Sequence, residues 1–472
     1  MTRLPDTITQ AAALLARGEI SPVDLVQAYL ERIQRLEPQL NCFITLTPEL
    51  ALQQARQAEA ELRAGERRGP LHGIPLALKD LFETAGVRTT AGSSFFAEHV
   101  PEMDAAVVQK LRAAGAVLLG KLNMHEIALG VTNENPHFGA TCNPWDLRCI
   151  PGGSSGGSGA ALAAGLCLGS LGTDTGGSIR IPASLCGIVG LKPTRGRVSL
   201  RGVIPLSWNL DHVGPMARCV RDAALLLGVI AGYDADDPWS VDQPVDDYLD
   251  GLEGSVAGWR VALAADEYFC DPAVVDAQVW EAVQGAAQAF ERLGARVEQV
   301  DFPEARQAAR ANGLMTPSDG AAFHQERMQS NPDGFGTDVL RRLRTGAAYT
   351  STEYILARKT QALMRHAFCQ FFNHYDLLLT PTTPVPALVR GSEDAVARAR
   401  LLTRFTAPFN LTGLPALSVP CGLTREGLPV GLQLVGPPWS EKRLLRAGYA
   451  FESLRIEDGV APLYPELSAR RG

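Results

Sequence analysis

Two glycine-rich loops that carry serine lie close together in the sequence. The first reads GGSSGG over Gly152–Gly157, and the second reads TDTGGS over Thr173–Ser178. Glycine has no Cβ, so such loops can expose backbone N–H groups to an anion or a developing oxyanion. A flexible linker is the ordinary alternative for Gly/Ser-rich sequence, but apolar residues lie between these loops and follow them. We therefore interpret the loops as a site of nucleophilic catalysis by serine.

A serine hydroxyl is a weak nucleophile and needs a base within hydrogen-bond reach. No histidine lies in or beside either loop, and the first one after them is His212. Lysine can replace histidine as the base, because a buried lysine loses its proton whereas arginine does not. Lys79 lies in the apolar segment GIPLALKD, in a chain that otherwise uses arginine for nearly all its positive charge. We take Lys79 as the candidate base.

Strands and helices alternate along the chain and would have to position these residues. Strands are expected at 74–78, 117–119, 188–190, 261–264, 375–384, 410–420 and 427–436, and helices at 23–33, 105–114, 160–171, 217–231 and 275–293. Ser21 followed by Pro22 is a typical start for the helix at 23–33, and Thr7 can cap an earlier one. Alternation of this kind predicts an α/β fold with a largely buried sheet.

We expect one domain with four parts. Residues 1–65 are helical, 70–235 hold the catalytic core, 236–372 form a variable helical elaboration that serves as a substrate wall or lid, and 374–472 close the sheet. The third part begins at an Asp-rich turn, Asp234–Pro238, and carries more charge than its neighbours. A scaffold-only role for that part stays open at this point.

Composition narrows the class of protein. The 472-residue chain is 46% hydrophobic and carries a formal net charge of -7, which gives no attraction to nucleic acid or to anionic membranes. No apolar run is long enough to cross a bilayer, and the start MTRLPDTITQ lacks the apolar core of a signal peptide. We expect a cytoplasmic protein that binds neither nucleic acid nor membrane.

Cysteine and histidine patterns bear on metals and cofactors. The nine cysteines contain no CxxC pair, and the eight histidines contain no HExxH motif. Reduced thiols and a site without metal or organic cofactor are therefore expected. The sequence does not fix the oligomeric state, for which a homodimer is the commonest closed form.

The motifs around these residues resemble those of the amidase signature family of Ser-Ser-Lys hydrolases. The matching segments are GIPLALKD, GGSSGGS, GTDTGGSIRIPASLCGIVGLKPT, TPTTP and GLPVGLQLVG. The resemblance implies a single-domain α/β/α sandwich around a large mixed, twisted β-sheet. It also implies an amidase that cleaves linear carboxylic-acid amides through an acyl-enzyme.

The resemblance implies a role for each residue of the two loops. Ser178 would attack the carbonyl, and Ser154, preceded by a cis peptide after Gly153, would relay the proton to neutral Lys79. The oxyanion hole would consist of the backbone N–H groups of Thr175, Gly176, Gly177 and Ser178. Ser155, Asp174 and Arg180 would support the loops. Gly130, Val131, Thr132 and Arg342 would contribute to the substrate pocket.

The substrate stays open between amides, anilides, carbamates (a urethanase activity) and esters. An α/β-hydrolase is disfavoured, because the residues before GGSSG make a poor strand and the last histidine, His374, lies early for that fold. A catalytically silent scaffold with the same fold is a further alternative.

A closer alternative is the glutaminase component of a tRNA-dependent amidotransferase, which the signature segments also resemble. Such a component works with partner subunits and holds glutamine between an arginine and an aspartate. Arg342 matches the arginine, but Thr403 falls where the aspartate is expected. An ammonium without a counter-charge binds poorly, so we favour a stand-alone amidase.

Overall fold

Strands from both halves of the chain come together in one mixed sheet. The computed structural model describes residues 4–302, 304–391, 399–458 and 465. Within them, 11 strands lie in the order β1-β3-β2-β6-β8-β7-β12-β13-β11-β9-β10. The α/β class and the large mixed sheet are as predicted.

Each strand is short. The sheet consists of β1 (Phe43–Leu46), β2 (Pro75–Lys79), β3 (Val117–Leu122), β6 (Gly169–Thr173), β7 (Val189–Lys192), β8 (Val213–Ala217), β9 (Arg260–Ala264), β10 (Arg296–Val300), β11 (Leu377–Pro381), β12 (Ala416–Leu423) and β13 (Pro429–Val435). A separate pair, β4 (Glu134–Asn135) and β5 (Gly139–Ala140), lies outside it.

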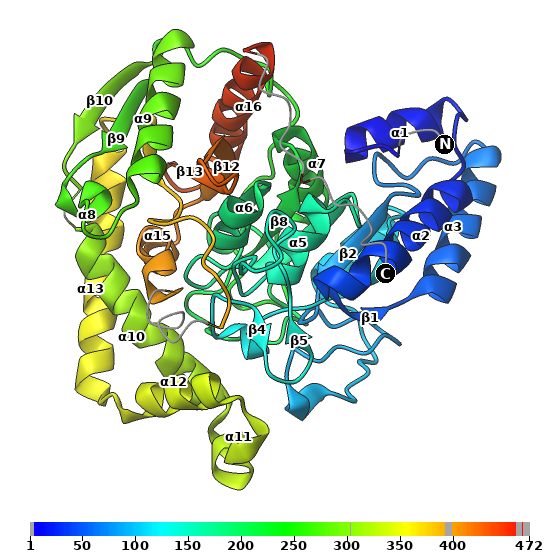
Figure 1. Cartoon of the computed structure of the whole chain (residues 1–472), viewed down its shortest axis with the longest axis horizontal. Helices are drawn as coiled ribbons and strands as arrows, with labels where there is room; N and C mark the ends of the chain where they lie inside the picture. The colour runs from blue at the N-terminus through cyan, green and yellow to red at the C-terminus, as the bar shows by residue number, and fades with distance from the viewer. Residues whose placement is uncertain (1–3, 303, 392–398, 459–464, 466–472) are drawn as a thin grey trace.

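Helices surround the sheet (Figure 1). They are α1 (Ile8–Ala16), α2 (Pro22–Leu40), α3 (Pro48–Arg63), α4 (Ala106–Ala113), α5 (Gly156–Ala163), α6 (Arg180–Cys186), α7 (Val220–Ile230), α8 (Glu267–Cys270), α9 (Ala277–Arg292), α10 (Ala305–Phe323), α11 (Gln325–Ser330), α12 (Thr337–Ala348), α13 (Ser351–Phe371), α15 (Ala407–Thr412) and α16 (Glu441–Glu457). Short 3₁₀ turns are η1 (Ser94–Phe96), η2 (Glu126–Ala128), η3 (Pro332–Gly334) and η4 (Arg400–Thr403). None of the helices in the described ranges is long and apolar enough to span a membrane.

Side-chain alternation places helices on opposite faces of the sheet. Gln433 of β13 accepts a hydrogen bond from Arg180, the first residue of α6. Leu417 of β12 pairs with Leu434, so it points to the other face, where its side chain packs against Gly448 of α16. The sheet is therefore sandwiched between helical layers, as the family resemblance implied.

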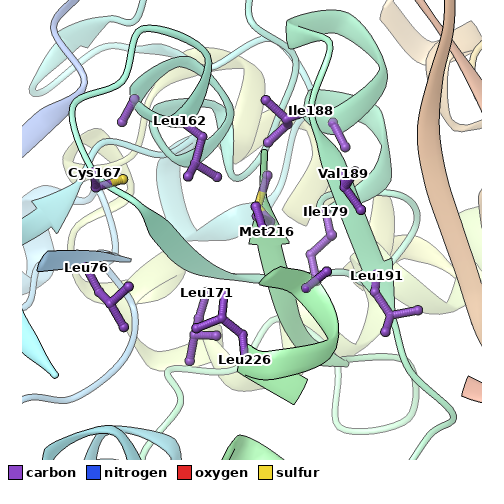
Figure 2. Packing of buried hydrophobic residues seen from close by; sticks show 14 of the residues in the cluster. Leu76, Leu162, Cys167, Leu171, Ile179, Ile188, Val189, Leu191, Met216 and Leu226 are labelled. Atoms are coloured by element: carbon purple, nitrogen blue, oxygen red, sulfur yellow. The ribbon is translucent and has the colours of Figure 1, made fainter. Parts of the chain in front are cut away.

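The core below the catalytic loops is apolar and closed. Every residue of β2, β6, β7 and β8 is buried. Figure 2 shows their side chains meeting those of neighbouring helices, among them Leu76, Leu162, Leu171, Val189, Leu191, Met216 and Leu226. Such close packing fixes the strand ends from which the catalytic loops start.

Capping residues start the N-terminal helices where the sequence predicts. The Thr7 side chain accepts from the Gln10 amide at the start of α1, and Ser21 accepts from the Asp24 amide at the start of α2. Both hydroxyls satisfy N–H groups that a helix leaves free at its first turn.

Two local expectations are wrong. The helix expected over 160–171 ends early, because Gly165 adopts a left-handed φ of 69° and the chain then enters β6. The strand expected over 410–420 begins only at Ala416, after the short helix α15. In both places small apolar residues fit either element, and pairing with neighbouring strands decides the outcome.

The strand order gives the place of the C-terminal strands, which the sequence left open. β11, β12 and β13 lie inside the sheet, next to β7 of the catalytic core. One end of the sheet consists of β9, where a strand was expected over 261–264, and the edge strand β10, for which no strand was expected. Residues 236–372 therefore extend the sheet as well as adding helices.

Candidate active site

Lys79 is the last residue of β2 and is completely buried. Its Nζ lies 2.7 Å from Ser154 Oγ and 2.8 Å from Thr173 Oγ1. The carboxylate of the next residue, Asp80, accepts a hydrogen bond from the backbone N–H of Thr90 at 2.9 Å. The structure thus brings together the two side chains expected to exchange a proton.

Burial disfavours the charged form of Lys79 and lowers its pKa to about 7. The carboxylates of Asp211 and Asp174 act in the opposite direction and raise it. A substantial fraction of Lys79 is therefore neutral at neutral pH and carries a lone pair that can accept a proton.

The first serine loop leads directly into α5. The peptide bond between Gly153 and Ser154 is cis, as the resemblance implied. Ser155 precedes the helix, and its Oγ donates to the carbonyl of Thr173 at 3.3 Å. The Ser155 amide donates to the carbonyl of Ser178, also at 3.3 Å. These two bonds tie the first loop to the second.

The second loop presents backbone N–H groups next to Ser178. In the described part of the chain, no protein group accepts a hydrogen bond from the amides of Thr175, Gly176 and Ser178. The Gly177 amide, expected in the oxyanion hole, instead donates to Asp174 Oδ1 at 2.7 Å. The structure therefore removes Gly177 from the expected set, because its single N–H is already engaged.

Gly177 still needs to be glycine. Its φ is 137°, and an added Cβ would lie 2.2 Å from Thr406 Oγ1. Thr406 Oγ1 in turn donates to the carbonyl of Gly176 at 2.6 Å. This close approach shapes the turn that precedes Ser178.

A buried ion pair supports this loop. Arg180 donates to both carboxylate oxygens of Asp174 at 2.9 Å, with both side chains fully buried. Arg180 also donates to Asn410 and Gln433, each at 2.6 Å. Burial by itself raises the pKa of Asp174, but the guanidinium overrides this and holds the pKa well below its usual range. Asp174 therefore stays charged, with its charge neutralised by Arg180.

Ser178 opens into a cavity of ≈ 330 Å³. Its lining consists of Ala128, Leu129, Gly130, Val131, Thr175, Gly176, Ser178, Leu206, Asn312, Gly313, Thr316, Pro317, Arg342, Thr345, Tyr349, Arg400 and Thr403. The Ser178 side chain and the free amides lie on one side, and helices α10, α12 and η4 provide the other. A small-molecule substrate would fit this space.

Three of the four residues expected in the substrate pocket line the cavity, and one does not. Gly130, Val131 and Arg342 line the cavity. Thr132 does not, because its Oγ1 lies 3.4 Å from His125 Nδ1 and accepts from the Glu134 amide. That expectation is corrected: Thr132 is buried and hydrogen-bonded within its own loop.

Sequence reasoning missed several residues of the site. Thr173, the second partner of Lys79, lies inside the second loop, where a threonine hydroxyl among serines gives no separate signal. Asp211 accepts from Thr175 Oγ1 at 2.6 Å, and Asn312 donates to the Thr175 carbonyl at 3.0 Å. Neither belongs to a motif, so only three-dimensional proximity reveals them.

Glu126 ties the helical side of the cavity to the core. Its buried carboxylate accepts from Ser93 Oγ at 3.0 Å and lies 2.8 Å from His137 Nε2. The other oxygen accepts from the amide of Gly336, which caps α12, at 2.8 Å. The helix that carries Arg342 is thereby held in place.

Most of the chain matches one known family. The sequence profile of the family described as Amidase matches residues 24–445. The chain belongs to the amidase family. Among the described residues, no group of three or more His, Cys, Asp or Glu side chains could hold a metal ion.

Similar members of this family have different named roles. A protein of Geotalea daltonii, named as one of the subunits of glutamyl-tRNA(Gln) amidotransferase, is 43% identical over 471 residues, 94% of this chain and 96% of that protein. A solved vestigial protein complex, described as revealing the evolutionary origins of an s-triazine catabolic enzyme, is 36% identical with a TM-score of 0.91, covering 97% and 99% of the two chains. The peptide amidase PAM is 32% identical with a TM-score of 0.82, covering 98% and 99%.

Proposed function

We propose that this amidase is a serine amidohydrolase that cleaves the amide of an acyl group bearing a carboxylate. The observation that carries the chemistry is the 2.7 Å contact of buried Lys79 with Ser154, beside the cavity that exposes Ser178. The observation that carries the substrate class is the cavity lining, which includes two arginines and, among described residues, no carboxylate.

The reaction is proposed to start with attack of Ser178 Oγ on the amide carbon. The Ser178 proton passes to Ser154 Oγ, and the Ser154 proton passes to neutral Lys79. Because no hydrogen bond joins Ser154 Oγ to Ser178 Oγ in the described chain, the two hydroxyls have to approach each other in the reaction. The amides of Thr175, Gly176 and Ser178 are proposed to stabilise the oxyanion, because no described protein group accepts from them.

Collapse of the tetrahedral intermediate breaks the C–N bond. Lys79 returns its proton through Ser154 to the leaving amine, which leaves an acyl-enzyme on Ser178. Water then attacks the ester, and the same relay takes its proton and gives it back to Ser178. Atoms and charges balance, and Lys79 ends the cycle neutral.

Arg342 is the proposed anchor for the substrate carboxylate. Its Nε donates to Asp338 at 2.7 Å, and among the described residues no group accepts from its outer N–H groups, which can bind a second carboxylate. Arg400 lies on the rim of the same cavity. An amino acid would bring an ammonium group as well, and Thr403 offers that group a hydroxyl instead of a charge.

Glutaminase activity within a tRNA-dependent amidotransferase is the second candidate. It is favoured by relatives named as glutamyl-tRNA(Gln) amidotransferase subunits, which are 43% identical and matched over 96% of their length. If this candidate holds, the chain would need partner subunits, and the proposal of a self-sufficient enzyme would fail.

Three matched amides separate the candidates: pentanamide, glutaramate and glutamine. They share a five-carbon acyl chain, to which glutaramate adds a carboxylate and glutamine adds a carboxylate and an ammonium. We expect ammonia release by the purified chain to be fastest with glutaramate, and Thr403→Asp to shift the preference toward glutamine. A wild-type chain that acts on glutamine alone, or on no amide until partner subunits are added, would favour the amidotransferase.

A further inference from the structure

Asp211 is a buried carboxylate that the proposed reaction does not use. It lies just before β8, whose residue Val213 pairs with Thr173 of β6. Because Thr173 Oγ1 lies 2.8 Å from Lys79 Nζ, this pairing brings Asp211 to the neighbourhood of the base. Burial raises the pKa of Asp211, while Lys79 acts to lower it.

The hydrogen bonds of Asp211 tie it to the oxyanion loop. Oδ1 accepts from the Thr175 hydroxyl at 2.6 Å. Oδ2 accepts from the amides of Leu206 and Ser207 at 2.9 and 3.0 Å. Both oxygens are therefore occupied, and the carboxylate has one orientation in which all three bonds form.

The charged groups around Lys79 differ in how far they are neutralised. Asp174 forms a two-armed ion pair with Arg180, so most of its charge is cancelled. His125 also interacts electrostatically with Lys79, but burial lowers the pKa of His125 to about 4 and leaves it neutral at neutral pH. Asp211 has no ion-pair partner within 4 Å among the described residues, and Arg195 interacts with it only at longer range.

We propose that Asp211 is a positioning residue with two effects on the reaction. It holds Thr175 so that the Thr175 amide faces the oxyanion, and its negative charge sets the pH at which Lys79 becomes neutral. This inference rests on the proposed function, because it needs Lys79 to act as the base.

The two effects have separate signatures. A carboxylate near Lys79 stabilises the ammonium form, so removing the charge lowers the pKa of Lys79. The acid limb of the pH profile, where kcat/KM falls as the pH decreases, then moves to lower pH. Loss of orientation at Thr175 lowers kcat without moving that limb.

The test compares Asp211→Asn with Asp211→Glu, using glutaramate hydrolysis from pH 5 to 9 by the full-length chain. We expect Asp211→Asn to lower kcat about ten- to hundredfold and to move the acid limb about one pH unit down. Asp211→Glu keeps the charge, so kcat falls but the limb stays within a few tenths of a unit of the wild-type position.

If Asp211→Asn lowers kcat but does not move the acid limb, the proposed effect of the Asp211 charge on Lys79 is wrong, and a merely structural role is left. Unchanged kcat would overturn the positioning part. If Asp211→Asn does not fold, Asp211→Ser, whose smaller side chain leaves room for water, is measured in its place with the same expectations. Wild-type activity that Ser178→Ala abolishes establishes the proposed function separately, so its failure is distinguishable from failure of this inference.

Discussion

The two sides of the cavity are built in different ways. On the catalytic side, Lys79, Ser154 and Asp174 are fully buried and Ser178 is 6% exposed. On the helical side, the Arg342 side chain is 20% exposed and Arg400 lies in the open. Side chains with several buried partners have one available position, whereas exposed ones can change partner at little cost in free energy. If the proposed function holds, the reaction takes place in a tightly packed layer of the protein, and substrate choice depends on a less tightly packed one.

Under the proposed function, this difference would allow members of one family to act on different compounds. The loops that hold Ser154 and Ser178 depend on one another through the hydrogen bonds of Ser155, so a change in either disturbs both. Among the described residues, Arg342 has a single ion-pair partner, Asp338. We therefore expect changes on the helical side to alter substrate binding while leaving the proposed proton relay intact.

The largest expected effect lies on the catalytic side. Ser178→Ala removes the nucleophile, and we expect kcat for glutaramate to fall at least about 10⁴-fold. Ammonia release measures this, and thermal unfolding checks that the fold is unchanged. Ser184→Ala is the matched control, because that buried serine of α6 contacts Thr383 outside the cavity. Substantial activity in Ser178→Ala would assign the nucleophile elsewhere.

Lys79→Ala should be nearly as severe, since residues of one relay fail together. The pH dependence of kcat/KM in the wild-type protein tests the role of Lys79 as a base. Below the Lys79 pKa of about 7 the amine is protonated and cannot act as a base, so kcat/KM should fall about tenfold per pH unit as pH decreases. In Lys79→Ala the residual rate should lose this limb. A variant that keeps the limb near pH 7 would exclude Lys79 as the titrating base.

The smallest effect is expected on the helical side. Arg342→Gln should raise KM for glutaramate about 10- to 100-fold, with kcat changed only a few-fold, because the lost contact exists in both ground and transition states. Pentanamide, which has no carboxylate, should be unaffected. Arg341→Gln is the control, since Arg341 pairs with the same Asp338 but does not line the cavity. Equal effects of the two variants would contradict a direct role for Arg342.

The sequence singled out most of the residues proposed for catalysis, because the proposed chemistry depends on residue types at fixed places in glycine-rich segments. Lys79 contacts Ser154, and Ser178 lines the cavity, while the engagement of Gly177 by Asp174 depends on loop geometry that no motif records. Asp211 and Asn312 reach the site from distant segments by packing, for which a single sequence carries no signal. The place of β9 and β10 at the sheet edge is likewise decided by tertiary pairing.

The sheet order also bears on how the protein is made. β7 belongs to the catalytic core, yet its neighbour is β12, which a ribosome produces only near the end of the chain. Asn410 and Gln433, which complete the contacts of Arg180, emerge equally late. Before these segments are made, the edge of β7 has no β12 to pair with. The Arg180 guanidinium, which is buried in the complete fold, also lacks two of its hydrogen-bond acceptors. Premature termination before β12 should yield an insoluble product, even though Lys79, Ser154 and Ser178 have all been translated.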